Sequence, residues 1–246
     1  MTLLSNKSIK GIFFDLYGTL LDYNDMEKSN LIWLNQFYKL AGIPNGLSFD
    51  SIKEICKKIL LEDHEKDHSD SLTTYESKIK FHFEQHGVVF SRERLKELAD
   101  ESLIHWQDNI TLSEDVYDVF RKLQDKYKLA LISNFDHTPH VKRVIKQLQL
   151  QNYLNPIIIS DEIGFKKPDP EIFRLTLERA GLTADEVIFI GDSYNDDIKG
   201  ARAAEIFPVM IQHISNSHSH NIIPDGTDLV TIQSLSELFD LLPNQE

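Results

Sequence analysis

The sequence predicts an α/β protein, with a Rossmann-like, doubly wound parallel sheet as its core and a helical cap domain inserted into it. Three observations support this. Short apolar runs rich in β-branched residues recur along the chain, and segments of helical period separate the later runs. One long stretch, residues 24–109, contains several amphipathic patterns and no convincing strand. Strands that alternate with helices indicate a parallel sheet with right-handed crossovers.

The apolar runs are predicted to be buried strands, because parallel strands covered on both faces are apolar almost throughout. The four clearest runs are GIFFD (11–15), KLALIS (128–133), NPIIIS (155–160) and EVIFIG (186–191). FPVMIQ (207–212) resembles one more strand, and residues 228–242 resemble a strand followed by a closing helix.

The helical segments divide into two groups. Those between and after the core strands cover residues 114–127, 140–150, 170–181 and 194–205. Those of the insert cover 29–42, 51–64, 74–87 and 91–107, with apolar residues at helical spacing. We therefore predict a catalytic core made of residues 1–23 and 110–246, and a helical cap made of residues 24–109.

Composition excludes several classes of protein. The 246 residues carry a formal net charge of −13, which argues against sequence-independent binding to nucleic acid or to an anionic membrane. Cys56 is the single cysteine, so an internal disulfide is impossible and a reducing cytoplasm is the expected location. No window approaches the ~18 to 20 apolar residues of a membrane span. Oligomeric state is left open.

Polar residues gather where the predicted strands end. Asp15 follows the first strand, Ser133 and Asn134 follow the second, and Asp192 and Ser193 follow the fourth. In an open parallel sheet, ligands bind beyond the carboxyl ends of the strands, so these side chains are the candidate site. Two lysines in GFKKPDP, Lys166 and Lys167, follow the third strand and can reach the same edge.

These residues form four motifs that resemble those of the haloacid dehalogenase-like hydrolase superfamily, in its subgroup with a helical cap. The first motif is Asp15 with Gly18 and Thr19, and the second is Ser133 in LISN. The third is Lys167 in KPDP, and the fourth is GDSYNDD at 191–197. All four occur in the order typical of that family.

The resemblance implies a mechanism. Asp15 would be a nucleophile that forms an aspartyl-phosphate, with Mg²⁺ held by Asp15, Asp192 and the backbone carbonyl of Tyr17. Ser133 and Lys167 would hold the transferred group. The residues expected to contact substrate are Gly18, Thr19 and Asn134.

The acids and the serine that follow Asp192 are expected to have supporting roles in the site. Asp197, with Ser193, is expected to support the site, by touching metal-bound water or orienting Lys167, whereas Asp196 is expected to favour the helix dipole. One of the two neighbouring lysines should be solvated. His218 and His220 lie in a polar loop at 213–228 and are not expected to hold a metal.

Tyr17 leaves the reaction open, because phosphatases of this superfamily usually carry Asp at that position as a general acid and base. The sequence favours a Mg²⁺-dependent phosphatase of a small phosphorylated metabolite, with the acid supplied elsewhere or with a substrate that has a good leaving group. A 2-haloacid dehalogenase shares the D-x-Y-G-T turn, but no arginine precedes Arg92 and Asp192 is intact. A phosphonatase-like carbon–phosphorus hydrolase would need a reactive cap lysine, for which Lys53, Lys57 and Lys58 are candidates. A metal-binding relative with little turnover is the last alternative.

Overall fold

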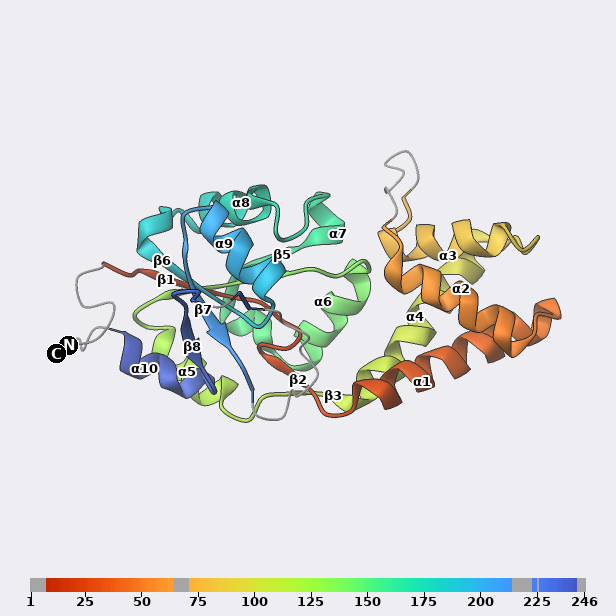
Figure 1. Cartoon of the computed structure of the whole chain (residues 1–246), viewed down its shortest axis with the longest axis horizontal. Coiled ribbons are helices and arrows are strands. Elements are labelled where there is room, and N and C mark those ends of the chain that lie inside the picture. The colour runs from red at the N-terminus through yellow and green to blue at the C-terminus, as the bar shows by residue number, and fades with distance from the viewer. Residues whose placement is uncertain (1–7, 64–70, 214–222, 225, 243–246) are drawn as a thin grey trace. The chain divides into compact units, whose positions relative to one another are not determined.

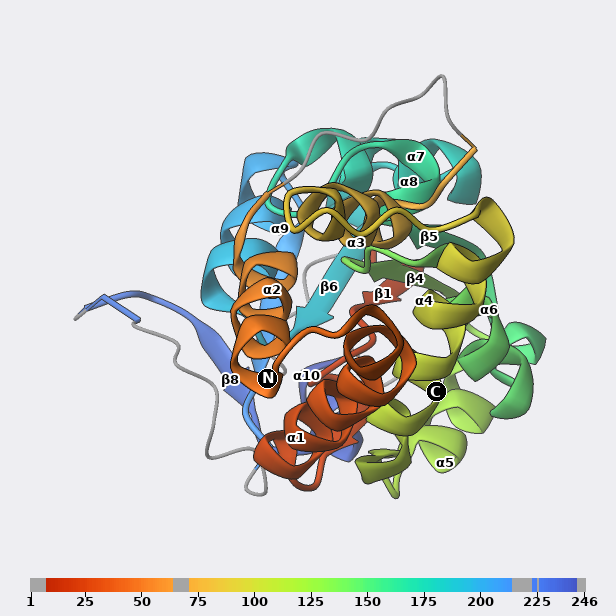
Figure 2. The ribbon, with the colours of Figure 1, turned by 90° about the vertical axis from the view of Figure 1, so that its right-hand side faces the viewer.

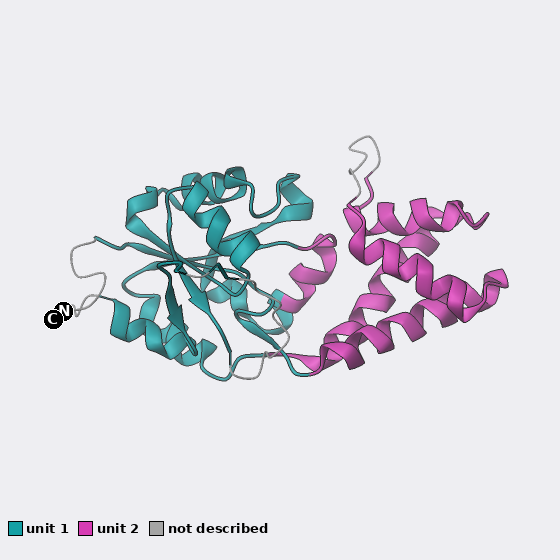
Figure 3. Cartoon of the chain, in the orientation of Figure 1, with its two compact units in different colours: residues 1–24, 112–134, 145–246 teal, residues 25–111, 135–144 magenta. Residues whose placement is uncertain are grey.

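A computed structural model describes residues 8–63, 71–213, 223–224 and 226–242. His218 and His220 lie outside these residues. The chain forms two compact units, coloured separately in Figure 3. Unit 1 contains residues 1–24, 112–134 and 145–246, and unit 2 contains residues 25–111 and 135–144.

Unit 1 is built on a six-stranded sheet in the order β5-β4-β1-β6-β7-β8, and every neighbouring pair is parallel. This confirms the predicted doubly wound α/β class. The strands are β1 (Gly11–Phe14), β4 (Lys128–Ser133), β5 (Leu154–Ile159), β6 (Val187–Gly191), β7 (Phe207–Ile211) and β8 (Val230–Ile232).

The register of β1 sets the position of the candidate site. Phe14, its last residue, pairs with Leu131 of β4 and with Ile190 of β6. Asp15 therefore leaves the sheet between the carboxyl ends of two neighbours that finish at Ser133 and Gly191. Strand order reverses around β1, which is where open parallel sheets place their ligands.

Alternate residues of the central strands bury apolar side chains on opposite faces of the sheet. Phe13, Ile132 and Phe189 pack on the face covered by α8 (Pro170–Ala180) and α9 (Lys199–Ala203). Phe14 faces the other way, and its ring lies 5.2 Å from that of Phe120 in α5 (Val116–Leu123). Figure 1 shows α8 and α9 on one face of the sheet and α5 with α10 (Leu238–Leu241) on the other.

In the described residues of 25–111, unit 2 has the α-helices α1 (Met26–Phe37), α2 (Phe49–Leu61), α3 (Thr74–Glu84) and α4 (Arg92–Trp106). Their starts are those that capping predicts, since Asp25, Ser48, Thr73 and Ser91 each accept a backbone N–H of the first turn. Figure 2 shows these helices in orange to yellow-green; α1 packs against α2 and α4, and α3 packs against α2 and α4. Their shared core includes Trp33, Phe37, Ile55, Phe83 and Leu98.

The structure adds elements that the sequence patterns do not reveal. Two three-residue strands, β2 (Leu21–Tyr23) and β3 (Ile110–Leu112), lie near the two ends of the insert. A short helix, α7 (Ser160–Ile163), follows β5. The first part of α6 (Thr138–Gln147) belongs to unit 2 although it follows a core strand. Among the helices of the described ranges, none combines the length and apolar character needed to cross a membrane.

Candidate active site

Three carboxylates converge at the carboxyl ends of β1 and β6. One oxygen each from Asp15, Asp192 and Asp197 lies within 4.8 Å of the other two. Asp15 continues the β1 ladder, since its N–H donates to the carbonyl of Ile190 at 2.9 Å. Asp192 follows β6 directly, so the parallel register brings residues 177 positions apart in the chain to one point.

The ammonium of Lys167 lies among these carboxylates. Its Nζ is 2.5 Å from Asp15 Oδ1, 2.7 Å from Asp197 Oδ1 and 3.0 Å from the carbonyl oxygen of Ile132. The Lys167 side chain is only 2% exposed, whereas Lys166 is exposed. Of the two neighbouring lysines, Lys166 is therefore the one exposed to solvent, and Lys167 of the KPDP motif lies among the carboxylates.

Asn134 holds the backbone of Lys167. Its Nδ2 donates to the Lys167 carbonyl at 2.9 Å, and its Oδ1 accepts the Lys167 N–H at 2.8 Å. The sequence suggests a substrate contact for Asn134. In the structure both functional atoms of its side chain bind this loop, so Asn134 fixes the end of β4 to the segment that carries the lysine.

Two glycines allow the carboxylates to approach the backbone. Gly18 has φ of +92°, and a Cβ there would lie 2.4 Å from a carboxylate oxygen of Asp192. At Gly191 a Cβ would lie 2.3 Å from the carboxylate carbon of Asp197. Any side chain at either position would displace the acid beside it, which is a physical reason for glycine in both motifs.

The turn after β6 separates the roles of its acids. Ser193 caps the following helical turn by accepting the Asp196 N–H at 3.2 Å, and its own N–H donates to Asp197 Oδ2 at 2.9 Å. Both oxygens of Asp197 are therefore engaged, one with this N–H and one with Lys167. Asp196 is not in the carboxylate cluster.

Burial and mutual repulsion dominate the electrostatics of the site. Burial raises the pKa of Asp15, although Lys167 counteracts it. Burial and then the charges of Asp15 and Asp197 raise the pKa of Asp192. Burial alone would lower the pKa of Lys167, but Asp15 and Asp197 outweigh it and the pKa is raised. The site thus holds three carboxylates and one ammonium. This excess of negative charge favours the binding of a further cation.

The donor set fits a small divalent cation. Carboxylate oxygens are the ligands that Mg²⁺ takes in proteins, usually one or two of them completed by water and substrate oxygens. Since Asp197 is engaged by Lys167 and the Ser193 N–H, Asp15 and Asp192 are the pair suited to a metal. The turn that follows Asp15 is closed by the Gly18 N–H, which donates to the Leu21 carbonyl at 2.7 Å.

Two buried hydroxyls of the predicted motifs have no hydrogen-bond partner within the described part of the chain. They are Ser133 Oγ, on a residue 1% exposed, and Thr19 Oγ1, on a residue 0% exposed. An unsatisfied buried hydroxyl costs free energy unless a ligand or water meets it. Ser133 ends β4 beside the carboxylates, so a bound phosphoryl oxygen would supply that partner.

Tyr23 and His213 also belong to this region, although neither is part of the four sequence motifs. The ring of Tyr23 stacks on that of Tyr17, with centroids 6.3 Å apart. Burial and then Asp192 and Asp15 raise the pKa of Tyr23, and burial and then Asp15 raise that of Tyr17, so both phenols stay neutral near pH 7. His213 Nε2 lies 2.9 Å from the carbonyl of Thr19. No motif spacing marks either residue.

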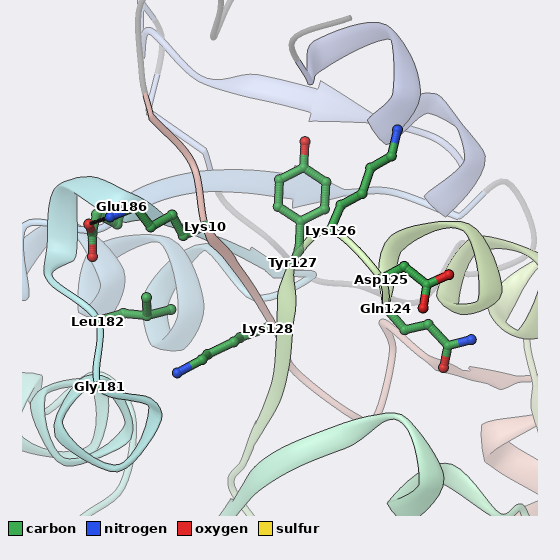
Figure 4. Close-up of a pocket in the computed structure, with 9 residues that line it drawn as sticks. All are labelled: Lys10, Gln124, Asp125, Lys126, Tyr127, Lys128, Gly181, Leu182 and Glu186. Carbon is green, nitrogen blue, oxygen red and sulfur yellow. Dashed lines mark hydrogen bonds and ion pairs between the residues drawn. The ribbon is translucent and has the colours of Figure 1, made fainter. Parts of the chain in front are cut away.

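A separate pocket of about 580 Å³ lies at the opposite edge of the sheet (Figure 4). Its lining includes Lys10, Lys128 and Glu186, at the amino ends of β1, β4 and β6. Lys10 pairs with Glu186, and Lys128 Nζ donates to the Ala180 carbonyl at 2.7 Å. The clustered carboxylates lie at the carboxyl ends of these strands, so this pocket is separate from the candidate site.

Two relatives that are named as phosphatases resemble this chain over almost its whole length. The chain is 24% identical over 242 residues to a glyceraldehyde 3-phosphate phosphatase of Methanothermobacter thermautotrophicus, covering 95% of this chain and 100% of the relative. It is 25% identical to the pyrophosphatase PpaX of Oceanobacillus iheyensis, over 92% of this chain and 97% of the relative.

A solved 2-haloacid dehalogenase from Pseudomonas syringae pv. Tomato superposes with a TM-score of 0.69 at 23% identity, covering 95% of this chain and 97% of that chain. At this identity the likeness shows the fold alone. The family profile described as haloacid dehalogenase-like hydrolase matches residues 9–205, which contain all four motifs and the carboxylate cluster. This chain belongs to the haloacid dehalogenase-like hydrolases.

Proposed function

We propose that this hydrolase is a Mg²⁺-dependent phosphatase that acts on a small phosphorylated metabolite. The observation that supports this most strongly is the placement of Asp15 and Asp192 with ligating oxygens within 4.8 Å, beside the buried ammonium of Lys167. A carboxylate nucleophile, a cation site and a fixed positive charge are what transfer of an anionic phosphoryl group requires.

The proposed reaction has two steps. An Asp15 oxygen attacks phosphorus, the bond from phosphorus to the substrate oxygen breaks, and the alcohol leaves with a proton taken from solvent or a neighbouring acid. Water then attacks the phosphorus of the aspartyl-phosphate, the bond from phosphorus to Asp15 breaks, and phosphate leaves. Two displacements at phosphorus replace one more difficult attack by water.

The side chains around Asp15 serve this reaction in distinct ways. Lys167, already bonded to Asp15, orients its carboxylate and neutralises charge on the transferred group. Ser133 donates its free hydroxyl to a phosphoryl oxygen. Asp197 keeps the lysine in place and does not touch the substrate.

Mg²⁺, held by Asp15, Asp192 and the carbonyl of Tyr17, would offset the repulsion between the carboxylates and the phosphate dianion. This assignment rests on the hard oxygen donors of the site and on the raised pKa of both carboxyl groups when no cation balances them.

The helical insert is proposed as a cap that supplies substrate contacts and limits access of water. Relatives named as phosphatases of glyceraldehyde 3-phosphate and pyrophosphate support a small phosphorylated substrate. The alternative of a lysine-dependent phosphonatase is weaker, because Lys53 and Lys57 are exposed and Lys58 is half-buried. Schiff-base lysines need desolvation or a nearby cation to become nucleophilic.

Hydrolysis of p-nitrophenyl phosphate with and without Mg²⁺ tests the proposal. We expect activity only with the metal, and its loss by a factor of about 10³ or more in Asp15→Asn. The matched control is Asp185→Asn, which changes an exposed acid at the amino end of β6 and should retain wild-type activity.

Two results would redirect the assignment. Chloride release from 2-chloropropionate without added metal would indicate a dehalogenase. Inactivation by borohydride in the presence of phosphonoacetaldehyde would indicate a lysine-dependent phosphonatase.

A further inference from the structure

The turn that follows Asp15 is closed by its own hydrogen bonds. The N–H groups of Leu20 and Leu21 both donate to the Leu16 carbonyl, at 3.0 and 2.8 Å. The Gly18 N–H donates in turn to the Leu21 carbonyl at 2.7 Å. Because these bonds tie the two ends of the turn together, a displacement of one of its residues carries the others with it. A contact that fixes one carbonyl of the turn therefore fixes the whole turn.

This turn lies against one of the clustered acids. A Cβ added at Gly18 would lie 2.4 Å from a carboxylate oxygen of Asp192, so the backbone of the turn packs directly on that acid. Asp15 leads into the turn from the end of β1. The distance between the carboxylates of Asp15 and Asp192, the proposed ligands of Mg²⁺, hence depends on where the turn is held.

Two residues from distant parts of unit 1 hold the turn from outside. Ser113 donates twice to the Leu20 carbonyl, from its N–H at 3.0 Å and from its Oγ at 3.2 Å. His213 Nε2 lies 2.9 Å from the Thr19 carbonyl. Since a carbonyl oxygen only accepts, Nε2 must carry a proton and donate it. The turn is therefore anchored at two successive carbonyls, and at Thr19 the anchor is a side chain.

The sheet places His213 at the same edge as the carboxylates. Met210 of β7 pairs with Gly191 of β6, so His213 and Asp192 both follow the ends of neighbouring strands. The His213 side chain is 8% exposed, and Asp22 Oδ1 lies 3.5 Å from the same Nε2. A carboxylate beside this nitrogen favours a proton on it, which is what the bond to the turn requires. His213 thus ties the turn to the strand next to the one that carries Asp192.

We propose that His213 is a positioning residue: its hydrogen bond to the Thr19 carbonyl holds the turn after Asp15 against Asp192, so that the two carboxylates can bind one Mg²⁺. All of these contacts lie within unit 1. The inference rests on the proposed function and adds to it a residue outside the four motifs. Mg²⁺ demands a near-ideal arrangement of its ligands, and residues that orient ligands typically account for about 10- to 100-fold in metal affinity or activity.

Two substitutions of His213 separate the hydrogen bond from mere polarity. The amide nitrogen of glutamine stands where histidine has Nε2, whereas that of asparagine is nearer the backbone. His213→Gln can therefore donate to the Thr19 carbonyl, and His213→Asn cannot. In titration calorimetry of the full chain with Mg²⁺, the Kd should rise about tenfold in His213→Asn and stay within about twofold of wild type in His213→Gln.

The matched control is Tyr117→Phe. The Tyr117 hydroxyl donates to the Leu148 carbonyl at 2.8 Å, so this variant also removes a bond from a side chain to a backbone carbonyl of unit 1. Neither residue belongs to the turn or to the carboxylate cluster, and the Kd for Mg²⁺ should stay within about twofold of wild type. Thermal unfolding of the metal-free variants shows whether their losses of stability are comparable. Should His213→Asn not fold, His213→Leu, which fills a similar space without a donor, replaces it.

Mg²⁺-dependent hydrolysis of p-nitrophenyl phosphate gives a second measurement. His213→Asn should need about tenfold more Mg²⁺ for half of its maximal rate. Its KM for the substrate at saturating Mg²⁺ should change less than about twofold, because His213 acts on the turn and not on the substrate.

Three results would overturn the inference. They are an unchanged affinity for Mg²⁺ in His213→Asn, equal losses of affinity in the asparagine and glutamine variants, and a rise in KM with unchanged affinity for Mg²⁺, which would make His213 a substrate contact. A wild-type protein that binds Mg²⁺ but hydrolyses no phosphate ester would instead overturn the proposed phosphatase function. The two failures are distinguishable, because calorimetry measures the effect of His213 without turnover.

Discussion

At the scale of the residue, the Lys167 ammonium is matched by its surroundings. An ammonium has three N–H donors, and the structure supplies three oxygens: from Asp15, Asp197 and the carbonyl of Ile132. Asp15 and the Ile132 carbonyl accept hydrogen bonds from this buried group, and Asp197 contributes an ion pair, so removing any one of the three weakens the hold on the ammonium. Asp197 is therefore expected to hold the lysine in place, and its substitution should affect activity more than that of its neighbour Asp196.

We expect Asp197→Asn to lower kcat by about 10- to 100-fold, because Lys167 loses a charged partner and shifts relative to Asp15. Asp196→Asn should change kcat less than about threefold. Steady-state kinetics at saturating Mg²⁺ measures both. The affinity for Mg²⁺, measured by titration calorimetry, should stay within about threefold in Asp197→Asn. A loss of metal binding in this variant would mean that Asp197 is a ligand.

Gly18 gives a second prediction at this scale. A methyl group there would meet the Asp192 carboxylate at 2.4 Å, and the φ of +92° is unfavourable for alanine. Gly18→Ala should lower the free energy of unfolding by about 1–3 kcal/mol and weaken Mg²⁺ binding. Urea denaturation and calorimetry test the two parts. Gly46→Ala, at a φ of +69° with no atom near the added Cβ, is the control for backbone strain alone and should leave metal affinity unchanged.

At the scale of the element, packing between β1 and α5 holds the strand that ends at Asp15. Phe14 and Phe120 are both 0% exposed, and their ring centroids lie 5.2 Å apart. The position of Asp15 thus depends on apolar contacts made one residue earlier.

Phe120→Ala should reduce the free energy of unfolding by about 3–5 kcal/mol, because it removes a large buried side chain and leaves a cavity beside Phe14. Phe165→Ala removes a phenylalanine that is 44% exposed in the same unit and should cost less than about 1 kcal/mol. Urea denaturation followed by circular dichroism compares them. Equal losses in the two variants would show that the Phe14–Phe120 contact does not stabilise unit 1.

At the scale of the whole molecule, the chain charge of −13 and the three clustered acids make the metal-free protein sensitive to pH. The folded-state pKa of Asp192 is raised by burial and by Asp15 and Asp197. At pH values above about 4, the ordinary pKa of an aspartate, Asp192 has lost its proton in the unfolded chain but still holds it in the folded protein. The stability that protonated Asp192 contributes is therefore fully present below about pH 4 and is lost as the pH rises through the raised pKa of the folded state.

We therefore expect Mg²⁺ to raise the melting temperature more at about pH 8 than at about pH 5, because the cation binds the ionised carboxylates and protons compete with it at lower pH. Thermal unfolding with and without Mg²⁺ at the two pH values measures the difference. In Asp192→Asn the stabilisation by Mg²⁺ should fall at both pH values. A stabilisation by Mg²⁺ that Asp192→Asn leaves intact would place the cation elsewhere.

Much of unit 1 is determined by the sequence. Its strands lie in largely apolar segments, and the predicted segments occur where the structure has β1, β4, β5, β6, β7 and β8. The polar residues at their ends were predictable because parallel strands place all their carboxyl ends at one edge. The helices of the insert were predictable from apolar spacing and from capping residues such as Ser48, Thr73 and Ser91.

Only the tertiary structure decided which acid pairs with Lys167, that Asn134 binds a backbone and that Tyr23 stacks on Tyr17. It also decided that residues 135–144 belong to the helical unit. Periodicity and spacing report which face of an element a residue occupies. Beyond the edge of the sheet at which a residue lies, they do not tell which side chains from distant elements touch each other, because those contacts depend on how the elements pack.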